Sequence, residues 1–99
     1  MEDSSDGPGT TKHTFTLFVS GMSVKSGYAI ENLRKICDTY LLDNYEVEII
    51  DISRDKEQAV IHQIVAIPTL IKTGPEPRRI ILGDLSDTEK VLTILNIRG

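Results

Sequence analysis

Apolar and polar residues alternate along the first apolar segment of the chain, which reads HTFTLFVSG. Phe15, Leu17 and Val19 occupy every second position. A two-residue period is typical of a β-strand with one buried face, so we predict a strand here. Phe18 lies on the other face of this strand, where we expect it to be buried under a helix or at an oligomer interface.

The next segment, from Ser23 or Lys25 to about Tyr40, changes to steps of three and four residues. Its apolar positions are Ala29, Ile30, Leu33, Ile36, Cys37, Tyr40 and Leu41. This spacing produces one apolar stripe and predicts an amphipathic helix. Cys37 lies on the stripe, and we interpret it as a small buried apolar side chain.

The middle of the chain predicts a second strand and a second helix. The stretch YEVEIIDIS, residues 45–53, is apolar on both faces, as in an inner strand of a covered sheet. Residues 56–65 predict a helix with more apolar residues than one face needs. For Val60 and Ile61 we favour core packing, and exposure in one state of the protein is the alternative. His62 is interpreted as partly exposed, without a catalytic partner.

The last third of the chain predicts two short strands and a helix. PTLIKTG and RRIIL read as strands joined by a GPEP turn. GDLSDTEKVLTILNI reads as the last helix, and Ser86 with Glu89 has the spacing of a capping box. The order is therefore β-α-β-α-β-β-α. A helix between two strands favours a parallel pair and a short turn an antiparallel one, which together give a thioredoxin-like α/β topology.

Length and composition narrow the class of protein. The 99 residues predict one domain over residues 13–99, preceded by a polar, disordered tail over residues 1–12. The formal net charge of −4 disfavours a nucleic-acid partner. The apolar runs are too short to span a bilayer, and the acidic N-terminus lacks the features of a signal peptide. We therefore expect a cytoplasmic protein with no membrane partner.

Few residues are suited to catalysis or to metal binding. Cys37 is the only cysteine, so the chain has no internal disulfide and no C-x-x-C motif. A zinc site needs about four clustered ligands, and two distant histidines do not supply them. We therefore predict no catalytic residue, no metal and no cofactor.

Ile67-Pro68-Thr69 is similar to the sequence with which a strand begins in thioredoxin-like oxidoreductases, where the prolyl bond is often cis and lies beside a redox pair. Here the matching loop, GMSVKS, contains no thiol. Thiol–disulfide exchange needs a thiolate, so a redox enzyme is not favoured. A thioredoxin-fold enzyme that uses Cys37 alone is the remaining enzymatic alternative.

Five segments together resemble the KaiB family: LFVSG, EVEIIDI, AIPTLIK, GPEPRRII and, most specifically, GDLSDTEKVL. The resemblance covers residues 13–95. It implies a non-enzymatic regulator of circadian timing or stress adaptation that binds a KaiC-type ATPase. It also implies two folds: a thioredoxin-like one, and an alternative KaiB fold with a rearranged C-terminal half. Further partners by resemblance are KaiA, a sensor kinase with a KaiB-like domain, and copies of the chain in a dimer or tetramer.

Basic residues and prolines are the candidate site residues under this resemblance. The candidate partner interface consists of Lys25, Arg54, Lys56, Lys72, Arg78 and Arg79. Arginine binds carboxylates through two parallel hydrogen bonds, which suits a protein contact, and a solvated surface is the alternative. Pro68, Pro75 and Pro77 lie within ten residues. Because prolyl bonds isomerise slowly, we hypothesise that they gate the change between the two folds; plain turn geometry is the alternative.

Three departures from the resemblance indicate a divergent bacterial member. The turn reads GPEP where a Pro-Pro-Pro-like run is typical, and the middle of the second helix reads AVIHQ where an acidic cluster is typical. The first helix also lacks the basic residue that the resemblance implies near Tyr28. We therefore expect a divergent KaiC-like ATPase as the partner. The alternative function is the KaiB-like sensor domain of a two-component histidine kinase.

Overall fold

The computed structural model describes residues 12–21, 23–42 and 44–97. The predicted tail over residues 1–12 lies outside the described residues, apart from Lys12. The elements are β1 (His13–Val19), α1 (Val24–Ile36), the π-helical turn η1 (Cys37–Leu41), β2 (Tyr45–Asp51), α2 (Lys56–Ile61), β3 (Thr69–Gly74), β4 (Arg79–Leu82) and α3 (Thr88–Leu95). The predicted order of strands and helices is confirmed. Within the described residues, no helix is long and apolar enough to cross a membrane.

The four strands form one mixed sheet in the order β2-β1-β3-β4. β1 is parallel to β2, as expected for strands joined by a helix, and antiparallel to β3. β3 and β4 form the predicted antiparallel hairpin. The prediction that residues 45–53 form an inner strand is wrong, because β2 is an edge strand and Ile49 is 46% exposed.

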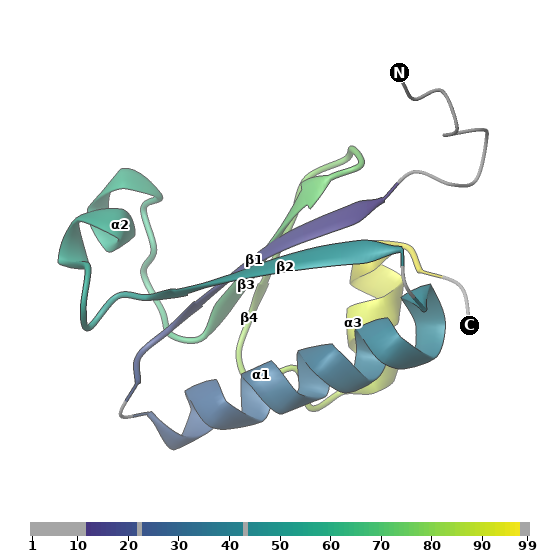
Figure 1. Ribbon diagram of the computed structural model, residues 1–99, viewed down its shortest axis with the longest axis horizontal. Coiled ribbons are helices and arrows are strands. Elements are labelled where there is room, and N and C mark those ends of the chain that lie inside the picture. The colour runs from purple at the N-terminus through teal and green to yellow at the C-terminus, as the bar shows by residue number, and fades with distance from the viewer. Residues whose placement is uncertain (1–11, 22, 43, 98–99) are drawn as a thin grey trace.

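Helices cover the two faces of the sheet unequally (Figure 1). α1 and α3 lie on one face and enclose the main core. Its buried side chains include Phe15, Leu17, Leu33, Leu70, Val91 and Leu95. On the opposite face, α2 lies beyond the end of β2. Phe18 is fully buried on this face, with its ring centroid 5.1 Å from that of His62, which confirms its predicted burial under a helical segment.

The helix ends show where local sequence determined structure. Ser23 caps α1, since its hydroxyl accepts a hydrogen bond from the Ser26 N–H. The second helix ends at Ile61 rather than at the predicted residue 65, because Gln63 adopts a φ of 55°, outside the right-handed helical region. The predicted capping box of Ser86 is wrong by one residue: the carboxylate of Asp87 caps α3.

Candidate interaction surfaces

The most exposed apolar side chains of the C-terminal half gather on and after α2. Val60, Ile61 and Val65 are 78%, 64% and 88% exposed, and we call these three residues the α2 surface. The favoured sequence interpretation, core packing of Val60 and Ile61, is wrong. The half-buried side of this short helix is occupied by Gln58 and Ala59, so the larger side chains point outward. Adjacent exposed aliphatic side chains of this kind are typical of a protein contact.

Two of the candidate basic residues adjoin the α2 surface. Arg54 lies in the connection between β2 and α2, Lys56 begins α2, and both are exposed. The structure therefore places positive charge at the beginning of the apolar helix. No carboxylate forms an ion pair with either side chain within the described residues.

The other candidate basic residues lie elsewhere. Arg78 and Arg79 are exposed at the start of β4, at the end of the sheet where β1 begins, and are thus separated from α2 by the length of the sheet. Lys25 is exposed in the first turn of α1. The six residues do not form one basic patch.

Lys72 is buried in this fold, with only 4% of its surface exposed. Its ammonium group donates a hydrogen bond to the Leu95 carbonyl, at 3.2 Å, near the end of α3. Burial lowers the pKa of this amine, and the positive charge of Arg79 lowers it further. Lys72 therefore ties β3 to α3 and is not accessible to a partner in this arrangement.

The three candidate prolines flank β3. Pro68 is fully buried directly before the strand, and Pro75 and Pro77 lie in the turn after it. All three prolyl peptide bonds are cis. The hydroxyl of Thr69 donates a hydrogen bond to the Ala66 carbonyl, at 2.6 Å, across the buried proline. Their role in a change of fold stays a prediction.

The loop after β1, where thioredoxin-type redox enzymes hold their thiols, is closed by local hydrogen bonds. The Ser20 N–H donates to the Ser26 hydroxyl at 3.0 Å, and the Gly21 N–H donates to Oδ1 of Asp51 at 3.1 Å. Asp51 also accepts from the N–H and hydroxyl of Ser53, and these bonds lower the pKa of its carboxyl group. The Asp-x-Ser spacing at the end of a strand indicates the bonds between Asp51 and Ser53. The bond to Gly21 has no sequence signal, because it joins residues 30 positions apart.

Cys37 has the environment of a structural residue. Its side chain is fully buried, as predicted, and burial raises the pKa of the thiol to about 12, with a further contribution from the Asp38 charge. At neutral pH the group is a protonated thiol rather than the reactive thiolate. Within the described residues, no group of three or more histidine, cysteine, aspartate and glutamate side chains is arranged to hold a metal ion.

Comparison with known proteins gives one consistent match. Residues 16–97 match the model of the KaiB domain. The circadian clock protein KaiB3 of Synechocystis sp. is 47% identical over 81 residues, which cover 82% of this chain and 79% of that protein. The circadian clock oscillator protein KaiB of a Synechococcus strain is 41% identical over 81 residues, covering 82% of this chain and 74% of its own length.

Solved structures with the same fold are more distant in sequence. The N-terminal domain of Synechococcus elongatus SasA superposes with a TM-score of 0.69 at 20% identity, covering 87% of this chain and 85% of that domain. The germline-specific thioredoxin Deadhead of Drosophila melanogaster gives a TM-score of 0.67 at 15% identity, covering 86% of this chain and 79% of that protein. These likenesses establish a thioredoxin-like fold.

Proposed function

The chain belongs to the KaiB family, and we propose that it is a regulatory protein that acts by binding a KaiC-type ATPase. Its relatives at 47% and 41% identity are named circadian clock proteins, which supports a role in circadian timing or in a related stress adaptation. The protein has no catalytic activity of its own in this proposal. Its output is the change that binding produces in the partner.

The α2 surface is the observation that carries the proposal. Val60, Ile61 and Val65 expose most of their area to water, although apolar burial is the main favourable term in protein association. A partner with a complementary apolar patch would remove this area from water. Arg54 and Lys56 beside it would face acidic groups at the polar rim of such an interface. We therefore assign the docking of the ATPase to this surface.

The position of α2 links binding to the state of the fold. α2 lies at the start of the C-terminal half, which the KaiB family rearranges between its two folds. A partner that binds α2 as it is placed here stabilises the thioredoxin-like state and draws the population toward it. We also propose that Pro68, Pro75 and Pro77 gate the change between the two folds. The other fold would assemble into a dimer or tetramer. KaiA and a sensor kinase with a KaiB-like domain are further proposed partners.

The alternative functions are less well supported. A sensor domain of a histidine kinase is not favoured, because the curated relatives at 47% and 41% identity carry KaiB names. A redox enzyme that uses Cys37 would need an accessible thiolate. The thiol is instead buried, with a pKa raised to about 12.

Co-elution with the ATPase tests the proposal. The purified chain is incubated for about a day with the KaiC-like ATPase of its own organism and ATP, which allows time for a slow change of fold, and is then run on a sizing column. We expect the two proteins to migrate together. An unrelated thioredoxin of similar size serves as the control for non-specific association. Separate elution from an intact ATPase ring would contradict the proposal.

A further inference from the structure

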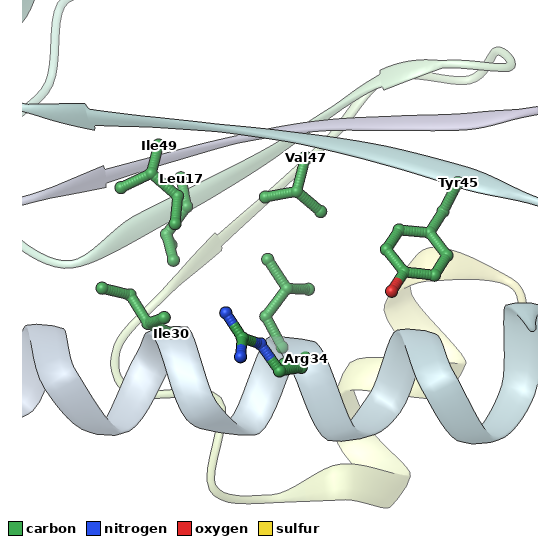
Figure 2. A pocket seen from close by; sticks show the side chains of 7 residues that line it. Leu17, Ile30, Arg34, Tyr45, Val47 and Ile49 are labelled. Atoms are coloured by element: carbon green, nitrogen blue, oxygen red, sulfur yellow. The ribbon is translucent and has the colours of Figure 1, made fainter. Parts of the chain in front are cut away.

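A second surface feature lies between α1 and the edge strand β2 (Figure 2), on the side of the sheet opposite α2 (Figure 1). It is a groove of about 260 Å³. The lining side chains come from three elements and are mostly apolar: Leu17, Ile30, Leu33, Arg34, Tyr45, Val47 and Ile49. Because β2 is the edge strand of the sheet formed by the described residues, the groove is open to water along that edge.

The groove has a firm apolar floor and an exposed rim. Leu17 and Leu33 form the floor and are 0% and 2% exposed, as parts of the main core. Ile49 on the rim is 46% exposed, which is high for a side chain that points toward a helix. A ligand with an apolar body would therefore bury isoleucine surface that the protein alone leaves in water.

Arg34 is the one charged residue among those lining the groove. Figure 2 shows its guanidinium group extending from α1 toward β2, between Ile30 and Tyr45. Within the described residues no carboxylate forms an ion pair with Arg34.

Two acidic side chains of β2 are directed away from the groove. Glu46 and Glu48 alternate with the lining residues of β2 and so lie on the other face of the sheet. A third acidic side chain, Asp38, accepts a hydrogen bond from the hydroxyl of the lining residue Tyr45 at 2.6 Å.

We propose that this groove binds a small amphipathic carboxylate, with its apolar body between α1 and β2 and its carboxylate paired with Arg34. Arg34 is exposed, and its guanidinium group can pair with a carboxylate through two parallel charge-assisted hydrogen bonds while the ligand body contacts the apolar walls. A neutral apolar ligand would leave the cation without a partner. A polyphosphate is disfavoured, because the groove would offer its several negative charges only one positive charge between apolar walls.

The size of the groove limits the ligand. Its volume of about 260 Å³ lies near the lower end of the range of small-molecule sites, about 300–1,000 Å³. A straight-chain acid of about eight carbons matches it. A ligand so small binds a half-open site with an affinity in about the high-micromolar to millimolar range.

The test is a titration of the full chain with octanoate, followed by amide chemical shifts in ¹H–¹⁵N spectra. We expect saturable shifts in β2 and in α1 around Ile30 and Arg34. In Arg34→Gln the affinity should fall at least about tenfold. Lys35→Gln is the matched control: it removes the neighbouring charge, which does not line the groove, and should leave the affinity unchanged. Octanol, which has no charge, should bind the wild-type protein more weakly than octanoate does. Its affinity for Arg34→Gln should equal its affinity for the wild type.

Three results would overturn the inference. They are the absence of saturable shifts along α1 and β2, an unchanged octanoate affinity in Arg34→Gln, and octanol binding as tight as that of octanoate. The proposed ATPase contact is independent of these outcomes, because α2 and α1 lie on opposite faces of the sheet (Figure 1).

Discussion

Two leucines have positive backbone φ angles but opposite environments. Leu42, directly after η1, has φ 52° and ψ −122° and is 69% exposed. Leu85, before α3, has φ 64° and is 4% exposed. This backbone region strains side chains with a Cβ atom and is readily adopted by glycine. Nothing in the residue type leucine indicates such a conformation, so the sequence analysis had no signal for it.

Replacing each leucine with glycine is expected to have opposite effects on stability. Leu42→Gly relieves about 1–3 kcal/mol of strain and loses little packing, so the free energy of unfolding should rise by about 1 kcal/mol after the added chain entropy. Leu85→Gly gains the same relief but removes a buried side chain, which costs about 2–5 kcal/mol. Urea unfolding of both variants measures the difference. A loss of stability in both would contradict the assigned strain at Leu42.

His13 is expected to make stability depend on pH. Burial lowers the pKa of this imidazole below its usual 6.5, with a further contribution from the positive charge of Lys72. Its Nδ1 atom is buried without a hydrogen-bond partner among the described residues. The unfolded chain therefore takes up the proton more readily than the folded one. The stability that the neutral His13 side chain contributes is therefore present in full above pH 6.5. It is lost as pH falls through the lowered pKa of the folded state.

Urea midpoints at about pH 7.5 and about pH 5.5 measure this effect. The wild-type protein should lose stability at the lower pH, and His13→Gln should lose less. His62→Gln is the matched control, because His62 is exposed, and it should lose as much as the wild type. Equal losses in His13→Gln and the wild type would show that His13 is not responsible.

The sequence pattern predicted elements well where one face is buried and poorly where a side chain's environment depends on distant parts of the chain. β1 and α1 follow their apolar periods because each packs one face on the main core. β2 was misplaced because apolar residues on both faces fit an inner strand as well as an edge strand that borders a groove. Exposure of Val60 and Ile61 was only the alternative interpretation, because periodicity cannot show which side of so short a helix faces the sheet.

α2 is expected to open more easily than the other helices. None of its residues is buried, whereas α1 buries Ala29, Leu33 and Ile36. Local opening requires less free energy where little apolar surface is buried. Native-state hydrogen exchange should therefore give protection factors in α2 at least about tenfold below those in the buried turns of α1. Equal protection in the two helices would mean that contacts beyond those described hold α2 in place.

At the scale of the whole molecule, the two faces of the sheet have different roles. α1 and α3 close the core on one face, and the groove at Arg34 opens at its edge. The other face carries the lightly attached α2 with its exposed aliphatic side chains. The KaiB family and the thioredoxin-like topology were predictable because motifs and element order lie in the sequence. The proposed docking surface was not, because its exposure depends on which side of α2 faces the sheet.

The affinity of two variants for the ATPase tests the central claim most directly. Val60→Gln with Ile61→Gln removes apolar area from the α2 surface and keeps good helix formers in α2. Leu42→Gln is the control, since it removes a similarly exposed side chain at the opposite end of β2. Titration against the KaiC-like ATPase with ATP should give a Kd at least about tenfold higher for the double variant, a loss of about 1.4 kcal/mol or more. The control should stay within about twofold of the wild type. An unchanged Kd in the double variant would contradict docking through α2.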